Sequence, residues 1–177
     1  MLKRPLIEEY PEYTRSYISL VPDGDITDIL ASQSDNTYTL LSNLSEAEAN
    51  FRYAEGKWSL SEVVGHLTDT ERIMGYRLLR ISRGDQTVLP GYSENDYVKE
   101  AAFHLRSLTD LLEDYKLVRR STISLMKGIP QHAWERIGSA NGYEITARAL
   151  PFMIAGHELH HMKIIKEKYL KGDSVKG

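Results

Sequence analysis

The segment GHELHHMKII, residues 156–165, contains the side chains with the clearest potential for chemistry. Residues 157–161 (HELHH) match the H-E-x-x-H pattern, in which two histidines one helical turn apart bind zinc and the glutamate activates water. Two other interpretations of His157 and His161 remain open. They can belong to a different metal site, or they can be a hydrogen-bonded pair in a protein core.

The residues after this segment argue against a zinc protease. Such enzymes need a third ligand, and their extended pattern places a glycine and a third histidine soon after the first pair. Here the chain continues with Met162, Lys163 and Ile164. Glu158 also lies about 100° around a helix from His157, at 3.6 residues per turn. We therefore interpret the H-E-x-x-H match as coincidental.

The two outer histidines lie on the predicted core face of the last helix, residues 146–170. The apolar seam of that helix consists of Leu150, Ile154, His157, His161 and Ile164, at alternating steps of four and three. Adjacent buried imidazoles each need hydrogen-bond partners and cannot easily both be charged. A divalent metal removes this difficulty because it takes a nitrogen lone pair from each ring.

His66 is the best candidate for a third ligand. It lies two turns after Ser59-Leu60-Ser61-Glu62, which fits a helix capping box. His104 and His132 fall in a helical lead-in and a loop, where surface histidines are usual. His160 lies beside the metal face. It could contact one of the ligands, or it could simply be a polar surface residue. Three neutral imidazoles on two helices leave coordination positions for water or substrate, which is typical of a catalytic site.

The rest of the chain predicts the elements that position these histidines. Helices are expected at residues 26–44, 59–83 and 107–127, the last with a shorter lead-in from residue 95. Asn141-Gly142 predicts a small β-hairpin before the last helix. The expected fold is all-α: one domain, residues 1–177, forming an antiparallel four-helix bundle with an extended lead at residues 1–24.

Composition excludes several classes of function. The 177 residues include six histidines and no cysteine, which excludes disulfides, thiolate metal sites and a cysteine nucleophile. The net charge of −3 argues against nucleic-acid binding. No apolar run approaches the ~18 residues of a membrane helix, and the first residues lack the apolar stretch of a secretion signal. We expect a cytoplasmic protein.

Three stretches resemble the DinB/YfiT-like superfamily: WSLSEVVGHLTDTERIMGYRLLRISRGD (58–85), LPGY (89–92) and AGHELHHMKII (155–165). With the opening EYPEYTRSYISLVP, the resemblance covers nearly the whole chain. It implies a four-helix bundle with one divalent metal, and the family's ligands match His66, His157 and His161. These are the three residues that spacing selected.

The resemblance also implies a function. The superfamily includes metal-dependent transferases that use low-molecular-weight thiols, such as bacillithiol or mycothiol, and members described only as metal-dependent hydrolases. Homodimers are common. We therefore expect a zinc- or nickel-dependent thiol S-transferase acting on a small molecule. The alternatives are a metal-dependent hydrolase and a non-enzymatic metal-binding or stress-response interaction module. The absence of cysteine fits a thiol that arrives as cosubstrate.

Catalytic residues are not assigned by sequence, but several helpers are candidates. Asp69 could orient an imidazole, Arg77 and Arg80 could hold an anionic group of a substrate, and Glu158 could act as a base. The alternative for the charges of the second helix is that they form helix-surface pairs worth about 0.3–0.5 kcal/mol each. These charges are Asp69, Glu71, Arg72, Arg77, Arg80 and Arg83.

Overall fold

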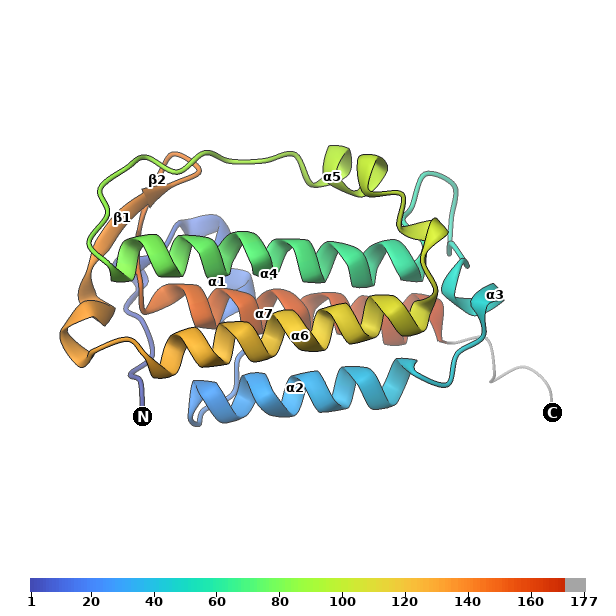
Figure 1. The fold of residues 1–177 in the computed structure, drawn as a ribbon, viewed down its shortest axis with the longest axis horizontal. Coiled ribbons are helices and arrows are strands. Elements are labelled where there is room, and N and C mark those ends of the chain that lie inside the picture. The colour runs from blue at the N-terminus through green and yellow to red at the C-terminus, as the bar shows by residue number, and fades with distance from the viewer. Residues whose placement is uncertain (171–177) are drawn as a thin grey trace.

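The computed structural model describes residues 1–170, in which four long helices lie side by side (Figure 1). They are α2 (Ile26–Leu41), α4 (Leu60–Ser82), α6 (Leu108–Lys127) and α7 (Ala149–Ile164). Helix α4 packs against α6 and α7, and α2 packs against the same two helices. The expected four-helix bundle is therefore confirmed. In cross-section, α2 and α4 lie at opposite corners of the bundle.

The directions of the helices are not simply alternating. Residues 83–107 run back along the length of the bundle and carry α5 (Glu94–Ala101) and a 3₁₀ turn, Phe103–Leu105 (Figure 1). Helix α6 therefore starts at the same end as α4 and runs parallel to it, whereas α4 and α7 are antiparallel. A short loop would force antiparallel neighbours, but a long crossover connection permits this arrangement.

The helix ends follow from local chemistry. Ser59 and Glu62 form the expected capping box of α4, and the Asp25 side chain accepts a hydrogen bond from the backbone N–H of Thr27 at the start of α2. Helix α7 begins at Ala149, three residues later than expected. Pro151 is tolerated there because it lies in the first turn, where its missing N–H has no intrahelical partner.

The predicted hairpin is present as β1 (Ile137–Ala140) and β2 (Tyr143–Thr146), which pair antiparallel. Asn141 and Gly142 have φ values of 55° and 80°. Two positive φ values in a two-residue turn match the right-handed twist of the strands, which explains the Asn-Gly sequence.

The first 24 residues are more helical than expected. They contain 3₁₀ turns at Ile7–Glu9 and Glu12–Thr14, and the single-turn helix α1 (Arg15–Ile18), which lies against α7. Further short elements are α3 (Glu46–Ala49), the 3₁₀ segment Gln131–Glu135, and a π-helical end of the last helix, Ile165–Tyr169. None of the described helices is both long and apolar enough to cross a membrane.

The core is divided along the bundle axis. One apolar cluster includes Leu78, Met126 and Leu150 near the hairpin, and a second includes Val64, Leu112 and Ile165 near α3 and α5. Between them the helices contribute polar and charged side chains with less than a tenth of their surface exposed. These are Thr37, His66, Thr70, Glu71, Arg119, His157 and Glu158. Such a layer needs internal partners, because a buried polar group without one is costly.

Candidate metal centre

Three of the six histidines meet between α4 and α7. The Nε2 atom of His157 lies 3.1 Å from Nε2 of His66 and 3.1 Å from Nε2 of His161. Each of the three residues offers one possible ligand atom, and these three atoms all lie within 4.8 Å of one another. Within residues 1–170 this is the one cluster of histidine and acidic side chains that could hold a metal ion.

Two of the three nitrogen separations fit ligands of one divalent ion. Ligand nitrogens about 2 Å from an ion would lie about 3.3 Å apart at tetrahedral angles and about 2.9 Å apart at right angles, and the observed 3.1 Å falls between these values. Hydrogen bonds alone do not satisfy the cluster. An imidazole nitrogen carries either one proton or one lone pair, so His157 Nε2 can form a full hydrogen bond with only one of its two neighbours.

The imidazoles are held neutral, the form that binds metals. Burial lowers the pKa of His66 to about 4. Burial, followed by repulsion from His66 and His160, lowers the pKa of His161 to about 3. The pKa of His157 is also well below its usual range, because that ring is deeply buried beside the other histidines. At neutral pH no proton has to leave before an ion binds.

Neighbouring side chains fix the ring of His66. The Trp58 ring packs on it with centroids 4.7 Å apart. One turn along α4, the Thr70 hydroxyl lies 3.4 Å from His66 Nδ1 and forms a 2.8 Å hydrogen bond with the Tyr92 hydroxyl. Burial raises the pKa of Tyr92 to about 12, so this phenol stays protonated.

The last helix approaches α1 closely beside the second ligand. A Cβ on Gly156 would lie 2.2 Å from the backbone oxygen of Tyr17, so only glycine permits this contact. The Tyr17 ring then meets the rings of His157 and His160 edge-on, with centroids 5.7 and 5.1 Å apart. This packing covers the centre on the side of α1.

The other side of the centre borders a cavity of about 220 Å³. His161 and Trp58 line it together with the more exposed Lys57 and Asn95. The Tyr169 ring also lines it, and the Tyr169 hydroxyl donates to the backbone oxygen of Trp58. Aromatic walls with a few polar groups are typical of small-molecule sites.

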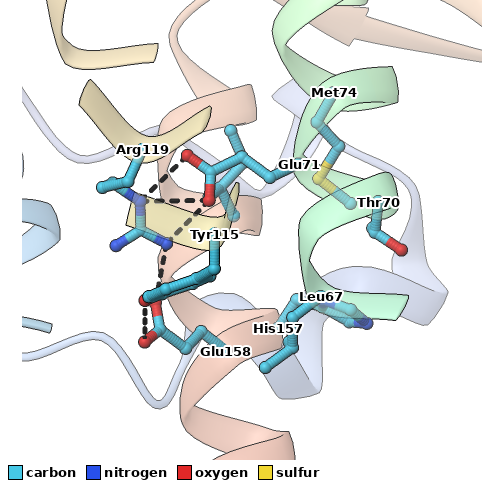
Figure 2. A pocket seen from close by; sticks show the side chains of 9 residues that line it. Leu67, Thr70, Glu71, Met74, Tyr115, Arg119, His157 and Glu158 are labelled. Carbon is cyan, nitrogen blue, oxygen red and sulfur yellow. Dashed lines mark hydrogen bonds and ion pairs between the residues drawn. The ribbon is translucent and has the colours of Figure 1, made fainter. Parts of the chain in front are cut away.

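A buried charge network lies on the inner side of His157 (Figure 2). The Arg119 guanidinium donates to both oxygens of Glu71 at 2.9–3.0 Å and to Glu158 at 2.7 Å. Tyr115 and Thr37 donate to the other oxygen of Glu158. The sequence contains a signal for this network, because Arg119 lies on the buried seam of α6, four residues after Tyr115 and seven before Met126.

The helper residues expected from the sequence are mostly elsewhere. Asp69 pairs with Arg72 at 3.0 Å, so Thr70, and not Asp69, is the group near the His66 ring. Arg80 pairs with Asp85 and the Tyr76 hydroxyl. Arg77 is buried and donates to the backbone oxygen of Pro90.

The remaining histidines and Glu158 divide between site and surface. His104 and His132 are exposed, as expected. His160 is partly buried, and its ring lies 5.2 Å from that of His161. Glu158 is only 2% exposed, and Arg119, Tyr115 and Thr37 occupy its carboxylate. This arrangement speaks against its proposed role as a free base.

Comparison with known proteins places the chain in a family. The family model described as the DinB superfamily matches residues 29–165, which include nearly all of the bundle. No curated protein matches the chain.

Several solved structures have a similar fold. YfiT from Bacillus subtilis, described as a probable metal-dependent hydrolase with an unusual four-helix bundle topology, is 15% identical, with a TM-score of 0.70 over 93% of this chain and 90% of YfiT. A mycothiol-dependent maleylpyruvate isomerase is 15% identical, with a TM-score of 0.65 over 81% of this chain and 60% of the isomerase. The DinB-like protein YjoA from Bacillus subtilis is 21% identical, with a TM-score of 0.59 over 81% of this chain and 88% of YjoA.

Proposed function

The chain belongs to the DinB superfamily, and from that premise we propose that it is a divalent-metal-dependent enzyme acting on a small molecule. His66, His157 and His161 are the proposed ligands. The observation that carries the proposal is the convergence of three neutral imidazoles, one of which, His161, lines a cavity. Three protein ligands leave coordination positions for water or substrate, whereas structural sites use four.

The preferred reaction is transfer of a low-molecular-weight thiol. A divalent ion in this centre would stabilise a bound thiol as thiolate or lower the pKa of bound water. The chain has no cysteine, so the sulfur nucleophile would have to arrive as a cosubstrate. The mycothiol dependence of a structurally similar isomerase supports this choice.

The chain's own residues would bind and orient the substrate. Trp58 and Tyr169 offer aromatic surface in the cavity, and the Lys57 ammonium offers a positive charge at its exposed side. We therefore propose a substrate with a planar or apolar body and an anionic group. Zinc and nickel are the preferred ions, since three imidazoles suit both.

Hydrolysis is the second candidate, and Glu94 is the observation that favours it. Glu94 precedes Asn95, which lines the cavity, and partial burial raises the pKa of the Glu94 carboxyl above its usual value. A carboxylate with a raised pKa is a better proton acceptor for an attacking water. The description of YfiT as a probable hydrolase supports the same alternative.

Parallel assays separate these reactions. Zinc- and nickel-loaded protein is incubated with a small thiol and an electrophilic alkene or epoxide, and separately with ester and amide substrates. Thiol transfer is expected in the first assay, with loss of activity in His66→Ala and little change in Glu94→Gln. Turnover of esters or amides that Glu94→Gln abolishes would instead establish hydrolysis.

If metal binds tightly and neither reaction exceeds the rate of the metal-free protein, the enzyme proposal fails. A metal-binding interaction module then becomes the better account. We also propose that the chain forms a homodimer and is cytoplasmic. Sedimentation of the full chain tests the first proposal, and cell fractionation tests the second.

A further inference from the structure

A small cavity lies between His157 and the buried charge network. Its volume is about 10 Å³, counted as the space that the centre of a water molecule can reach. By this measure one water needs at least about 10–15 Å³. Its polar walls come from Thr70, Glu71, Tyr115, Arg119 and Glu158 (Figure 2). Leu67, Met74 and Ile154 supply its apolar walls, so a water here would rely on the polar groups for the two to four partners that a buried water needs.

His157 lines this cavity, and its ring needs a hydrogen-bond acceptor. Within residues 1–170, both close polar contacts of its ring use Nε2, the atom directed at the other histidines. When Nε2 binds a metal, the proton of the neutral ring must be on Nδ1. A metal-bound histidine almost always donates this N–H to a carboxylate, a carbonyl or a water.

The network has the capacity to accept a water's protons. One oxygen of Glu71 and one oxygen of Glu158 each accept from Arg119 alone, although an ionised carboxylate oxygen can accept two hydrogen bonds. The network also has a surplus of negative charge, because two carboxylates face one guanidinium. That surplus lies beside a centre whose three ligands are neutral, so it would partly balance a dication.

We propose that one buried water connects His157 to the charge network, accepting from His157 Nδ1–H and donating to the carboxylates of Glu71 and Glu158. These glutamates are then positioning residues for the metal ligand. The inference rests on the proposed metal centre. It adds a specific role for the Arg119 network, which otherwise has none beyond stability.

The first test uses the unmodified protein. In zinc-loaded, 15N-histidine-labelled protein, the His157 ring is expected to carry its proton on Nδ1 and to show a nuclear Overhauser contact with a long-lived water. A proton on Nε2, no contact with a bound water, or a hydrogen bond to a backbone carbonyl would each overturn the proposal.

The second test compares two variants that remove the same formal charge. Glu71→Gln is expected to weaken zinc binding about 10- to 100-fold, the usual effect of losing a partner of a metal-bound histidine. Glu9→Gln, which breaks an ion pair with Arg148 near the hairpin, is expected to leave zinc affinity unchanged. Equal affinities in the two variants would overturn the role of Glu71.

The outcomes separate this inference from the proposed function. Failure of the parent protein to bind zinc or nickel would remove the metal centre itself. Tight zinc binding without the water contact would remove only the water and its glutamates. If Glu71→Gln does not fold, the measurement on the unmodified protein still decides.

Discussion

Proton release during metal binding is the sharpest consequence of the buried histidines. At pH 6.0, ordinary histidines with a pKa of 6.5 are about three-quarters protonated, so three of them would release about 2.3 protons on binding one ion. In this protein the pKa of His66 is about 4 and that of His161 about 3, and that of His157 is well below 6.5. The expected release is therefore less than about 0.1 proton per ion from the imidazoles.

Isothermal titration calorimetry with zinc at pH 6.0 measures this number, from the dependence of the observed heat on the ionisation enthalpy of the buffer. The same reasoning predicts the pH dependence of affinity. Between pH 7 and pH 5, three ordinary histidines would lose affinity roughly ten-thousand-fold, whereas this site is expected to lose less than about twofold. Release of two or more protons would show that the ligands titrate as exposed groups and would refute the reasoning.

Four other measurements test separate parts of the structure. The metal-free protein is expected to lose stability as pH falls from 6.5 towards 4, because the unfolded chain takes up protons before the folded one. At pH 5, His66 alone accounts for a loss of about 2 kcal/mol in the free energy of unfolding. Unchanged urea midpoints over this pH range would contradict this. Gly156→Ala is expected to destabilise the protein by about 1–3 kcal/mol in urea unfolding, since its Cβ would meet the Tyr17 backbone, whereas Gly75→Ala, whose Cβ would lie 3.8 Å from the Thr122 hydroxyl, lacks that clash. Arg119→Met is expected to cost about 3–5 kcal/mol in urea unfolding, because it leaves two buried carboxylates without their cation. Lys57→Met is expected to raise KM for an anionic substrate with metal content unchanged, and an unaltered KM would remove Lys57 from the binding role.

Much of the fold could be predicted because its signals are local. The capping box at Ser59 and the apolar period of α4 act within one helix, and the Asn141-Gly142 turn acts within four residues. The histidine cluster was also accessible, because steps of three and four place His157 and His161 on one face. The convergence of His66 with that pair depended on the fold and on the family resemblance.

The parallel arrangement of α4 and α6 was not accessible in this way. It depends on the path of residues 83–107, which cross the length of the bundle without an apolar period that reveals their direction. Without knowledge of that path, four helices of similar length suggest the common arrangement, in which short loops join antiparallel neighbours.

The charge network was missed for a different reason. Glu71 and Glu158 were interpreted as a helix-surface charge and a candidate base, because charged side chains are rarely buried. Arg119 at a seam position of α6 was the available signal, since a cation on a buried face requires a buried anion. The structure shows both carboxylates in that role, each less than a twentieth exposed.

The helper residues show the limit of reasoning from one helix. Asp69 and Arg80 lie on α4 with His66, yet their partners come from within their own helix or the following loop. The group nearest the His66 ring is instead the hydroxyl of Thr70, which a search for charges passes over.

The most direct test of the central claim is metal analysis of tag-free protein beside two matched variants. The parent and His104→Ala, which alters an exposed histidine outside the cluster, are expected to retain about one zinc or nickel ion per chain. His66→Ala is expected to lose most of it, because only two imidazoles remain. An undiminished ion in His66→Ala would contradict a centre shared between α4 and α7.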